Sequence, residues 1–248
     1  MLLNDKVAIV TGAAAGIGEG TAALFAAEGA TVWMADRDAA RLHGAAEAVR
    51  AAGGAAHAIV CDVTGAASVS AMADAVIREH GRVDILINNA GVYPRRTFLD
   101  MTEDDWDRML DINLKGTFRC TKAVLPHMVE RQAGKIVNIS SVTFHVGLPN
   151  LTHYVASKGA IIGLTRSLAR EMGPHNIHVN CITPGAVLVE REKEFVDEEG
   201  VRAMLALQCL QRRIVPLDIA RVCAFLSCEL SDGMTGQTLN VDGGWYML

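Results

Sequence analysis

The sequence predicts an α/β fold in which seven parallel strands form a doubly wound sheet with helices on both faces. Short runs rich in β-branched residues alternate with longer alanine-rich stretches of helical spacing, which is the order of βαβ units. A glycine-rich turn joins the first of these runs to the first helical stretch. The length of 248 residues fits one domain spanning 1–248, and no Pro-, Gly- or Ser-rich linker divides the chain.

The elements follow from the length and spacing of each run. The predicted strands are 6–11, 31–35, 56–61, 83–87, 134–139, 177–182 and 237–241. The predicted helices are 16–28, 38–52, 66–80, 102–131 with a break near Asn113, 153–172 and 216–229. Ligands bind beyond the carboxyl ends of parallel strands, so the residues after each strand are the candidates for a site. The segment from 186 to about 215 has no clean period, and we expect it to form a substrate loop.

Composition and charge argue against several classes of partner. The net charge of −5 and the pI of about 5.9 offer no footprint for nucleic acid or an anionic membrane. No apolar run reaches the roughly eighteen residues of a membrane span, and a strand-like run begins within six residues of the start, so we expect a cytoplasmic protein. The six cysteines are scattered and lack a Cys-x-x-Cys pair. We therefore expect free thiols and no metal site.

The turn "TGAAAGIG" at 11–18 ends the first predicted strand. Its glycines leave the backbone free to approach a pyrophosphate at the amino end of the next helix. The spacing differs from the Gly-x-Gly-x-x-Gly fingerprint, so plain turn chemistry is the alternative. The order of strand, glycine turn and helix favours a dinucleotide site.

Acidic residues follow the second and third predicted strands. Asp36 lies eighteen residues after Gly18, where a carboxylate can accept a hydrogen bond from an adenosine ribose. The same carboxylate repels a 2′-phosphate, so we expect NAD to be preferred over NADP, with Arg37 softening the discrimination. A solvated turn is the alternative for Asp36. Asp62 and Val63 are candidates to face an adenine, although Asp62 could instead cap a helix.

The fourth predicted strand ends in "INNAG" at 87–91. We expect Asn88 and Asn89 to bond to backbone groups of neighbouring strands, and Ala90 and Gly91 to leave space for a ring. A tight turn explains the glycine but not the paired asparagines.

Tyr154 and Lys158 are four residues apart in a predicted helix and therefore share one face. A phenol with its ordinary pKa of about 10 is a poor base at neutral pH. An ammonium about 4 Å away stabilises a phenolate by roughly 4 kcal/mol at an effective dielectric of about 20, less the cost of burial. The pair is a candidate acid and base, and we expect the pKa of the phenol to approach neutrality.

Two more polar residues accompany this pair. Ser141 follows the fifth predicted strand, where its hydroxyl can donate to a carbonyl oxygen. Asn113 falls inside an otherwise helical stretch, where its amide could hold a kink or a water, and the alternative is an asparagine that faces solvent. Tyr-x-x-x-Lys is common by chance, so the interpretation depends on the combination.

The chain resembles the short-chain dehydrogenase/reductase family, which has a single-domain Rossmann fold. The resemblance runs from end to end and rests on "TGAAAGIG", "NNAG", "NISS", "YVASK", "HVNCITPG" and "GQTLNVDGG" in that order. It implies that hydride passes between a substrate carbon and nicotinamide C4. In the implied catalytic set, Ser141 polarises the substrate oxygen, Tyr154 moves the proton, Lys158 lowers the tyrosine pKa and holds the nicotinamide ribose, and Asn113 supports a proton-relay water.

The resemblance also implies a set of cofactor-binding residues along the strand ends. They are Gly12, Gly16, Ile17, Gly18, Asp36, Asp62, Val63, Asn89, Ala90, Gly91, Tyr154, Lys158, Pro184, Gly185 and Val187. One position departs from the pattern. Many family members have a threonine that contacts the nicotinamide carboxamide, where this chain has Val189. That contact is not expected here.

The expected substrate pocket is apolar on balance. Its walls are expected from 142–147, 93–96, Thr152, His153 and the loop 186–215. This composition favours a secondary alcohol or ketone with a hydrophobic or ring-shaped body, and "YP" and "THY" are similar to dehydrogenases of aryl-alkyl alcohols. His145 and His153 could instead bind a polyol or sugar, or lie at the surface. Arg95 and Arg96 could bind a carboxylate or simply meet water.

Other functions remain open from the sequence. A carrier-protein ketoacyl reductase is the near alternative, but such enzymes generally use NADPH, which Asp36 disfavours. A nucleotide-sensing protein without chemistry would be expected to lose Ser141, Tyr154 or Lys158. A serine hydrolase lacks its Gly-x-Ser-x-Gly elbow around Ser141.

The assembly and the acidic run at 190–200 complete the expectations. The resemblance and the apolar ending "VDGGWYML" lead us to expect a homotetramer. The run "EREKEFVDEEG" is expected to form a solvated helical lid. It has neither the His and Cys ligands of a transition metal nor the spacing of a calcium loop.

Overall fold

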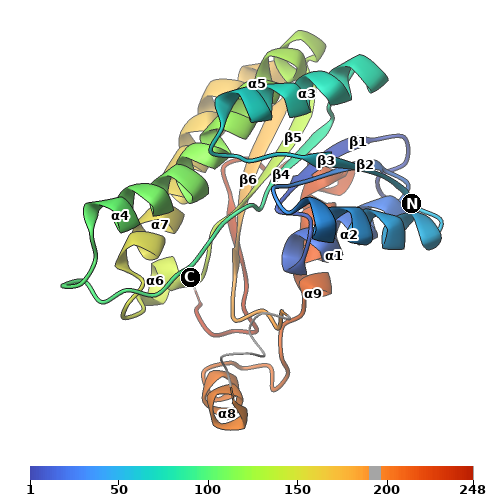
Figure 1. Cartoon of the computed structure of the whole chain (residues 1–248). Helices are drawn as coiled ribbons and strands as arrows, with labels where there is room; N and C mark the ends of the chain where they lie inside the picture. Colours follow the sequence, from blue (N-terminus) through green and yellow to red (C-terminus); the bar gives the residue numbers. More distant parts are fainter. Residues whose placement is uncertain (190–196, 248) are drawn as a thin grey trace.

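A parallel β-sheet forms the centre of the computed structural model, which describes residues 1–189 and 197–247 (Figure 1). The sheet has seven strands in the order β3-β2-β1-β4-β5-β6-β7, and every neighbouring pair is parallel. The strands are β1 (Val7–Thr11), β2 (Thr31–Asp36), β3 (Ala55–Val60), β4 (Ile85–Asn88), β5 (Gly134–Ile139), β6 (Ile177–Pro184) and β7 (Thr238–Val241). The predicted doubly wound α/β fold is confirmed.

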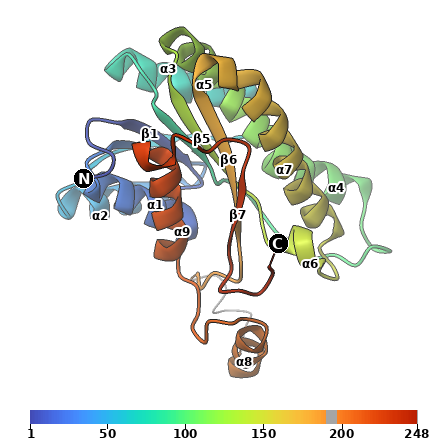
Figure 2. The ribbon, with the colours of Figure 1, turned by 180° about the vertical axis from the view of Figure 1, so that it is seen from behind.

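Helices cover both faces of the sheet (Figures 1 and 2). One layer consists of α1 (Gly16–Ala27), α2 (Ala39–Ala51) and α9 (Pro216–Ser227). The other layer consists of α3 (Ala66–His80), α5 (Gly116–Arg131) and α7 (Thr152–Met172). The helices α4 (Glu103–Leu110), α6 (Thr143–Val146) and α8 (Glu198–Ala206) lie toward the carboxyl ends of the strands. None of the helices in the described part of the chain is long and apolar enough to cross a membrane.

The central strands bury both of their faces, which explains why they appear as continuous apolar runs in the sequence. Successive side chains of a strand point to opposite faces. Ala8 and Val10 accordingly pack with Phe25 of α1 in one core, whereas Val7 and Ile9 pack in a second core under α3 and α5. The sheet is held between two separate apolar layers.

The strand order reverses between β1 and β4, which are adjacent in the sheet but separated in sequence by β2 and β3. At such a point the connections from neighbouring strands leave in opposite directions and open a crevice at the carboxyl edge. The turn after β1 and the "NNAG" segment after β4 therefore lie side by side at this crevice.

The expected break near Asn113 is confirmed. A five-residue π-helical segment, η1 (Asp111–Lys115), separates α4 from α5. Such segments widen the helix and redirect a side chain. The other predicted boundaries agree with the structure within two residues. Helix α6 was not predicted, because it is a single turn without a measurable period, and α8 overlaps the predicted helical lid only at residues 198–200. Residues 190–196 of the predicted lid lie outside the described part of the chain.

Candidate active site

The glycine turn after β1 brings its backbone close to that of β4. Gly12 has a φ of +66°, and a Cβ atom built on it would lie 2.8 Å from Ala90 Cα. A Cβ atom on Gly18 would lie only 2.1 Å from the Gly12 carbonyl oxygen. Ala15 is the N-cap residue of α1, and its side chain cannot accept a hydrogen bond from the first amides of that helix. The turn therefore has no room for side chains and presents helix N–H groups to the crevice.

Thr11 joins this turn to the end of β4. Its hydroxyl donates to Ile87 O and accepts from the backbone N–H groups of Asn89 and Ala90. Asn89 Nδ2 donates back to Thr11 O at 3.0 Å and to Gly12 O at 3.1 Å. The prediction that Asn89 bonds to a neighbouring strand is confirmed, and its side chain shapes the turn rather than pointing into open space.

Asn88 behaves differently from the prediction. It donates to the side chains of Thr121 on α5 and Asn138 on β5, both at 2.9 Å, and not to backbone groups. Asn138 in turn donates to Thr165 of α7. These buried amides and hydroxyls link the strands to the helix layer, because a buried polar group must find a partner.

Asp36 closes β2 beside the glycine turn. One of its carboxylate oxygens accepts from Ala14 N at 3.2 Å and the other from Asp38 N at 3.0 Å. Asp36 is therefore more than a solvated turn residue, because its carboxylate forms a hydrogen bond with the glycine turn. Asp62 accepts from Thr64 N and Thr64 Oγ1, and these bonds lower the pKa of its carboxyl group. It does not cap α3, whose N-cap is Gly65.

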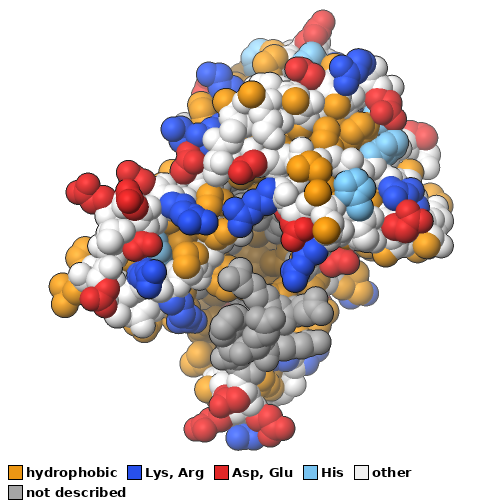
Figure 3. Space-filling model, in the orientation of Figure 1, with side chains coloured by type: hydrophobic (Ala, Val, Ile, Leu, Met, Phe, Trp, Pro, Cys, Tyr) orange, Lys and Arg blue, Asp and Glu red, His pale blue; other side chains and the backbone are white. Residues whose placement is uncertain are grey.

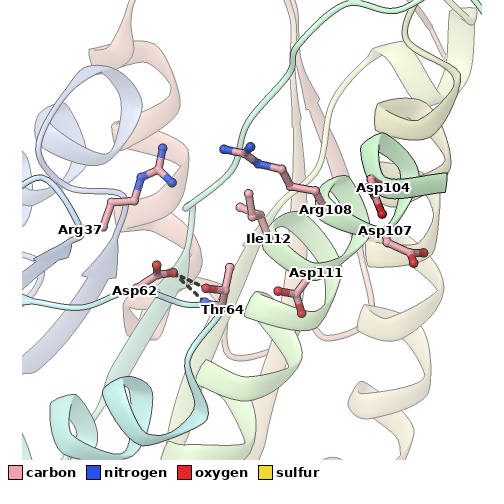
Figure 4. Close-up of a pocket in the computed structure, with 8 residues that line it drawn as sticks. All are labelled: Arg37, Asp62, Thr64, Asp104, Asp107, Arg108, Asp111 and Ile112. Carbon is pink, nitrogen blue, oxygen red and sulfur yellow. Dashed lines mark hydrogen bonds between the residues drawn. The ribbon is translucent and has the colours of Figure 1, made fainter. Parts of the chain in front are cut away.

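An open groove of about 600 Å³ lies beyond β2 and β3 (Figure 4). In Figure 4, Arg37 and Asp62 lie on the strand side, and Ile112 and the side chains of α4 and η1 lie opposite. The space-filling view shows the recess between these two halves, with charged side chains at its rim (Figure 3). The residues that line the groove are Arg37, Asp62, Thr64, Asp104, Asp107, Arg108, Asp111 and Ile112. Val63 is buried instead and packs against Gly116.

Tyr154, Lys158 and Ser141 meet at the carboxyl edge of the sheet. Lys158 Nζ lies 5.6 Å from the centroid of the Tyr154 ring and donates to Ile139 O, at the end of β5, at 2.8 Å. The Ser141 side chain forms a hydrogen bond with Tyr154. Its Oγ accepts from Thr143 N and Thr143 Oγ1, at 3.2 and 3.0 Å. The fold thus gathers a hydroxyl, a phenol and an ammonium into one cluster.

Burial dominates the protonation of this cluster. It raises the pKa of Tyr154 to about 12, although the hydrogen bond with Ser141 opposes the change. Burial also lowers the pKa of Lys158 to about 8. The expected approach of the tyrosine pKa to neutrality is therefore wrong for the protein without cofactor. Burial disfavours the charged phenolate more than the hydrogen bond with Ser141 favours it.

Asn113 is fully buried in η1, so the solvent-facing alternative is wrong. Its Oδ1 accepts from Val92 N at 2.8 Å, and its Nδ2 donates to Val92 O at 2.9 Å. Nδ2 also lies 3.2 Å from Ser157 Oγ, whose hydroxyl donates to Tyr154 O. The amide thus connects the segment after β4 to the helix that carries the tyrosine.

Gly91 lies between these groups. A Cβ atom built on it would come within 3.2 Å of Asn113 Oδ1 and 3.6 Å of Lys158 Nζ. The absent side chain lets the backbone at Gly91 lie close to both an amide and an ammonium.

The motif after β6 positions the base of the expected substrate loop. Gly185 N donates to Val241 O, and a Cβ atom on Gly185 would lie 2.7 Å from Asp242 Cα, so only glycine fits. Pro184 O accepts from Val142 N. Val187 pairs with Ile214 in an isolated bridge, which closes the two ends of the segment that carries α8.

Val189 lies beside the glycine turn. Its Cγ1 would be 3.2 Å from a Cβ atom built on Gly16. Its methyl groups cannot form the hydrogen bond that the threonine of many family members would form at this position.

Two aromatic contacts involve residues that are expected to line the substrate pocket. The rings of Tyr93 and Tyr154 meet edge to face, 6.3 Å between centroids. His145 stacks on Tyr246 near the end of the chain, 4.8 Å between centroids. His153 is fully buried, and burial lowers its pKa, so the surface alternative is wrong for this residue. A neutral imidazole there suits an apolar pocket.

The two arginines near this pocket have separate surroundings. Arg96 Nε lies 3.5 Å from Asp105 Oδ2 of α4, so its charge is already paired. This pairing argues against its use for a substrate carboxylate. Arg95 forms no hydrogen bond or ion pair with the residues that the structure describes.

A glycine turn at the switch point of a parallel sheet, next to a tyrosine, a lysine and a serine, defines a dinucleotide-binding oxidoreductase. A family model described as enoyl-(acyl carrier protein) reductase matches residues 12–246. The chain belongs to the short-chain dehydrogenase/reductase family, whose members use a nicotinamide cofactor.

Curated relatives cover nearly the whole chain. The short-chain reductase protein NovJ of Streptomyces niveus is 42% identical over 97% of this chain and 94% of its own. The 3-oxoacyl-[acyl-carrier-protein] reductase FabG of Thermotoga maritima is 36% identical over 98% and 99%. The cyclopentanol dehydrogenase of a Comamonas species is 36% identical over 98% of each chain. They differ in substrate, so the family and not the substrate follows from them.

Several residues that shape the site were missed from the sequence. Thr11, Ser157 and Thr143 hold candidate residues in place, yet each was counted only as part of a strand, a helix or a pocket wall. Tyr246 was noted only as part of an apolar tail. A hydroxyl at the last position of a buried strand, as in Thr11, is the one local signal that could have identified such a residue.

Proposed function

We propose that the protein transfers hydride between NAD(H) and a secondary alcohol or ketone, with Tyr154 as the acid and base. The observation that carries this proposal is the cluster of Ser141, Tyr154 and Lys158 beside the glycine turn. Asn113 supports it through the Ser157 hydrogen bond. The residue roles that the family resemblance implies agree with this arrangement.

The residues at the carboxyl edge fit a dinucleotide. Gly12, Gly16 and Gly18, with Ile17 between them, would border the pyrophosphate at the start of α1. The nicotinamide ribose would lie beside Gly91, within reach of Lys158. The groove beyond β2 and β3 would take the adenosine. The other residues proposed to contact the cofactor are Asp36, Asp62, Val63, Asn89, Ala90, Tyr154, Pro184, Gly185 and Val187.

The chemistry divides among the side chains. The nicotinamide, when bound, supplies the hydride acceptor or donor. In oxidation, the Ser141 hydroxyl donates to the alcohol oxygen and holds it near Tyr154, which takes the hydroxyl proton. The Lys158 ammonium stabilises the negative charge on the phenol oxygen. Asn113 holds the loop after β4 against α7 and would support a proton-relay water.

The substrate side favours an apolar body. The Tyr93 ring meets that of Tyr154, and the rings of Phe144 and Tyr246 contact that of His145 on α6. Arg96 is paired with Asp105. The segment 186–215, closed at its base by Val187 and Ile214, is the proposed substrate loop of the single domain 1–248. The cyclopentanol dehydrogenase relative acts on a cyclic secondary alcohol, which is the proposed class.

A substrate panel tests the proposal. Cyclic and aryl-alkyl secondary alcohols are expected to reduce NAD with a higher kcat/KM than polyols or sugars, and the absorbance of the reduced cofactor measures the rate. The second candidate is a ketoacyl reductase, which the FabG relative favours. A higher kcat/KM for a β-ketoacyl thioester with NADPH than for any ketone with NADH would replace the proposal with that candidate.

Asp36→Ala is expected to lower the preference for NAD over NADP by at least about tenfold in kcat/KM, because a carboxylate repels a 2′-phosphate. Four aspartates and two arginines line the adjacent groove, which also disfavours an added phosphate. Asp38→Asn is the matched control, since it removes a charge two residues away while its side-chain oxygen can still cap α2. An NAD/NADP ratio that is the same in both variants and in the wild type removes Asp36 from the account.

We also propose a cytoplasmic homotetramer. The proposal rests on the family resemblance, on exposed apolar side chains such as Phe118 of α5 and Met247, and on six free cysteines, five of them buried. Light scattering coupled to size exclusion would give a mass of four chains. A monomer mass at micromolar concentration would contradict it.

A further inference from the structure

A second cluster of chemically active side chains lies at the far edge of the sheet. His57 is in β3, the edge strand, and Glu79 and His80 are in the last turn of α3. Glu79 Oε1 lies 3.7 Å from His57 Nδ1 and 3.8 Å from His80 Nε2, and the three atoms all lie within 4.8 Å of one another. We propose that these side chains bind one divalent transition-metal ion, with Zn²⁺ as the preferred ion.

The ligand chemistry favours such an ion. Two imidazole nitrogens and one carboxylate oxygen are a ligand set that zinc uses, with a water in the fourth position. Zinc binds imidazole nitrogen and carboxylate oxygen at about 2.1 Å. At the observed separations there is a point within about 2.5 Å of all three ligand atoms. If each ligand atom moves by a few tenths of an ångström, all three reach the bond length of zinc. Ca²⁺ and Mg²⁺ prefer oxygen ligands and do not fit it.

Unsatisfied atoms also point to a ligand. His80 Nε2 is buried and has no hydrogen-bond partner among the described residues. A buried nitrogen without a partner costs free energy, which a metal bond recovers. Glu79, at 3.8 Å, is too far from this nitrogen for a hydrogen bond but at a suitable distance to share an ion with it.

The surroundings hold the cluster in place. Trp33 is the register partner of His57 on the neighbouring strand and stacks on its ring, 4.7 Å between centroids and 7° between planes. Trp33 meets His80 edge to face at 5.9 Å. The carboxyl end of α3 carries the negative end of the helix dipole, which favours a cation. Gly81 ends the helix in the left-handed conformation and so fixes the orientation of its last turn.

The site is separate from the candidate active site. Four residues separate the end of α3 from the start of β4, so the cluster lies near the amino ends of the strands. The amino end of α7, which carries Tyr154, lies toward their carboxyl ends (Figure 1). A bound ion would fasten the end of α3 to the edge strand. The sequence did not suggest it, because His57 and His80 are far apart in the chain and their proximity depends on strand register.

Titration of the full-length, tag-free, chelator-treated protein with ZnCl₂ tests the proposal. Calorimetry and metal analysis after dialysis are expected to give one ion per chain with a Kd of about 10 µM or lower. Co²⁺ is expected to quench the fluorescence of Trp33, since its ring stacks on a ligand, and Trp33→Phe should remove the quenching but not the binding. Zn²⁺ is also expected to raise Tm by a few degrees at a hundredfold excess over Kd.

Variants assign the ligands. His57→Ala, Glu79→Gln and His80→Ala are each expected to raise the Kd at least tenfold while turnover is unchanged. His43→Ala, an exposed histidine of α2, and Cys209→Ser, the exposed thiol, are the controls that should bind as the wild type does. Binding that survives His80→Ala, or fewer than half an ion per wild-type chain, would overturn the proposal.

Discussion

Tyr154→Phe is expected to lower kcat by about 10³-fold while the Kd for the dinucleotide changes less than about threefold. The substitution removes only the phenol oxygen, which is the proposed proton acceptor in alcohol oxidation. The ring remains, so its edge-to-face contact with Tyr93 and its place above Lys158 are kept. Steady-state turnover and fluorescence titration of the cofactor measure the two effects separately.

Tyr93→Phe is the matched control for this prediction. It removes a hydroxyl from the neighbouring ring, and we expect turnover to stay within about tenfold of the wild type. Residual activity of Tyr154→Phe above about one tenth of the wild type, in a correctly folded variant, would contradict the assigned role. Equal losses in the two variants would indicate a packing effect of the aromatic pair instead.

Ser141→Ala is expected to lower kcat by about 10²-fold, because the substrate oxygen loses a positioned donor. Ser141 Oγ accepts two hydrogen bonds from Thr143, which leaves its own hydrogen available for another oxygen. The variant should also lose the hydrogen bond that opposes the rise in the pKa of Tyr154, so its residual activity should need a higher pH. Ser141→Thr keeps the hydroxyl and should recover part of the loss, which a mere change of packing would not produce.

The fold was predictable because its rules are local or nearly so. Apolar runs and helical spacing gave the seven strands and the two helix layers, and the interruption at Asn113 was visible as an amide in a helical stretch. Spacing four residues apart placed Tyr154 and Lys158 on one face of α7. Short elements such as α6 carry too few residues to show a period.

The energetics of the site were not predictable in the same way. The sequence shows that a phenol and an ammonium lie on one helix face, but it does not show how deeply they are buried. Lys158 is enclosed by β5 and α7 and donates to Ile139 O, a contact nineteen residues away in the chain. The resulting loss of hydration moves the pKa of Tyr154 up and that of Lys158 down, against the expected attraction. His153 was judged by its polarity alone and is buried in the structure.

We therefore assign the working proton to the pair of Tyr154 and Lys158 and not to the tyrosine alone. Because burial lowers the pKa of Lys158 to about 8, we expect both groups to hold their protons below that pH, where the pair cannot accept one from an alcohol. Above that pH one proton has left, and the pair can act as a base. Oxidation should rise with pH through this value, and ketone reduction, which needs the protonated pair, should fall through it.

The most direct test is the pH profile of kcat/KM for alcohol oxidation, measured from pH 6 to 10 for the wild type and for Lys158→Met. We predict a wild-type plateau above an apparent pKa of about 8. In Lys158→Met only the phenol remains, and burial already raises its pKa to about 12 in the wild type, so the residual rate should rise through the whole range without a plateau. Two profiles with the same apparent pKa near 8 would show that the lysine does not set the basicity of the site.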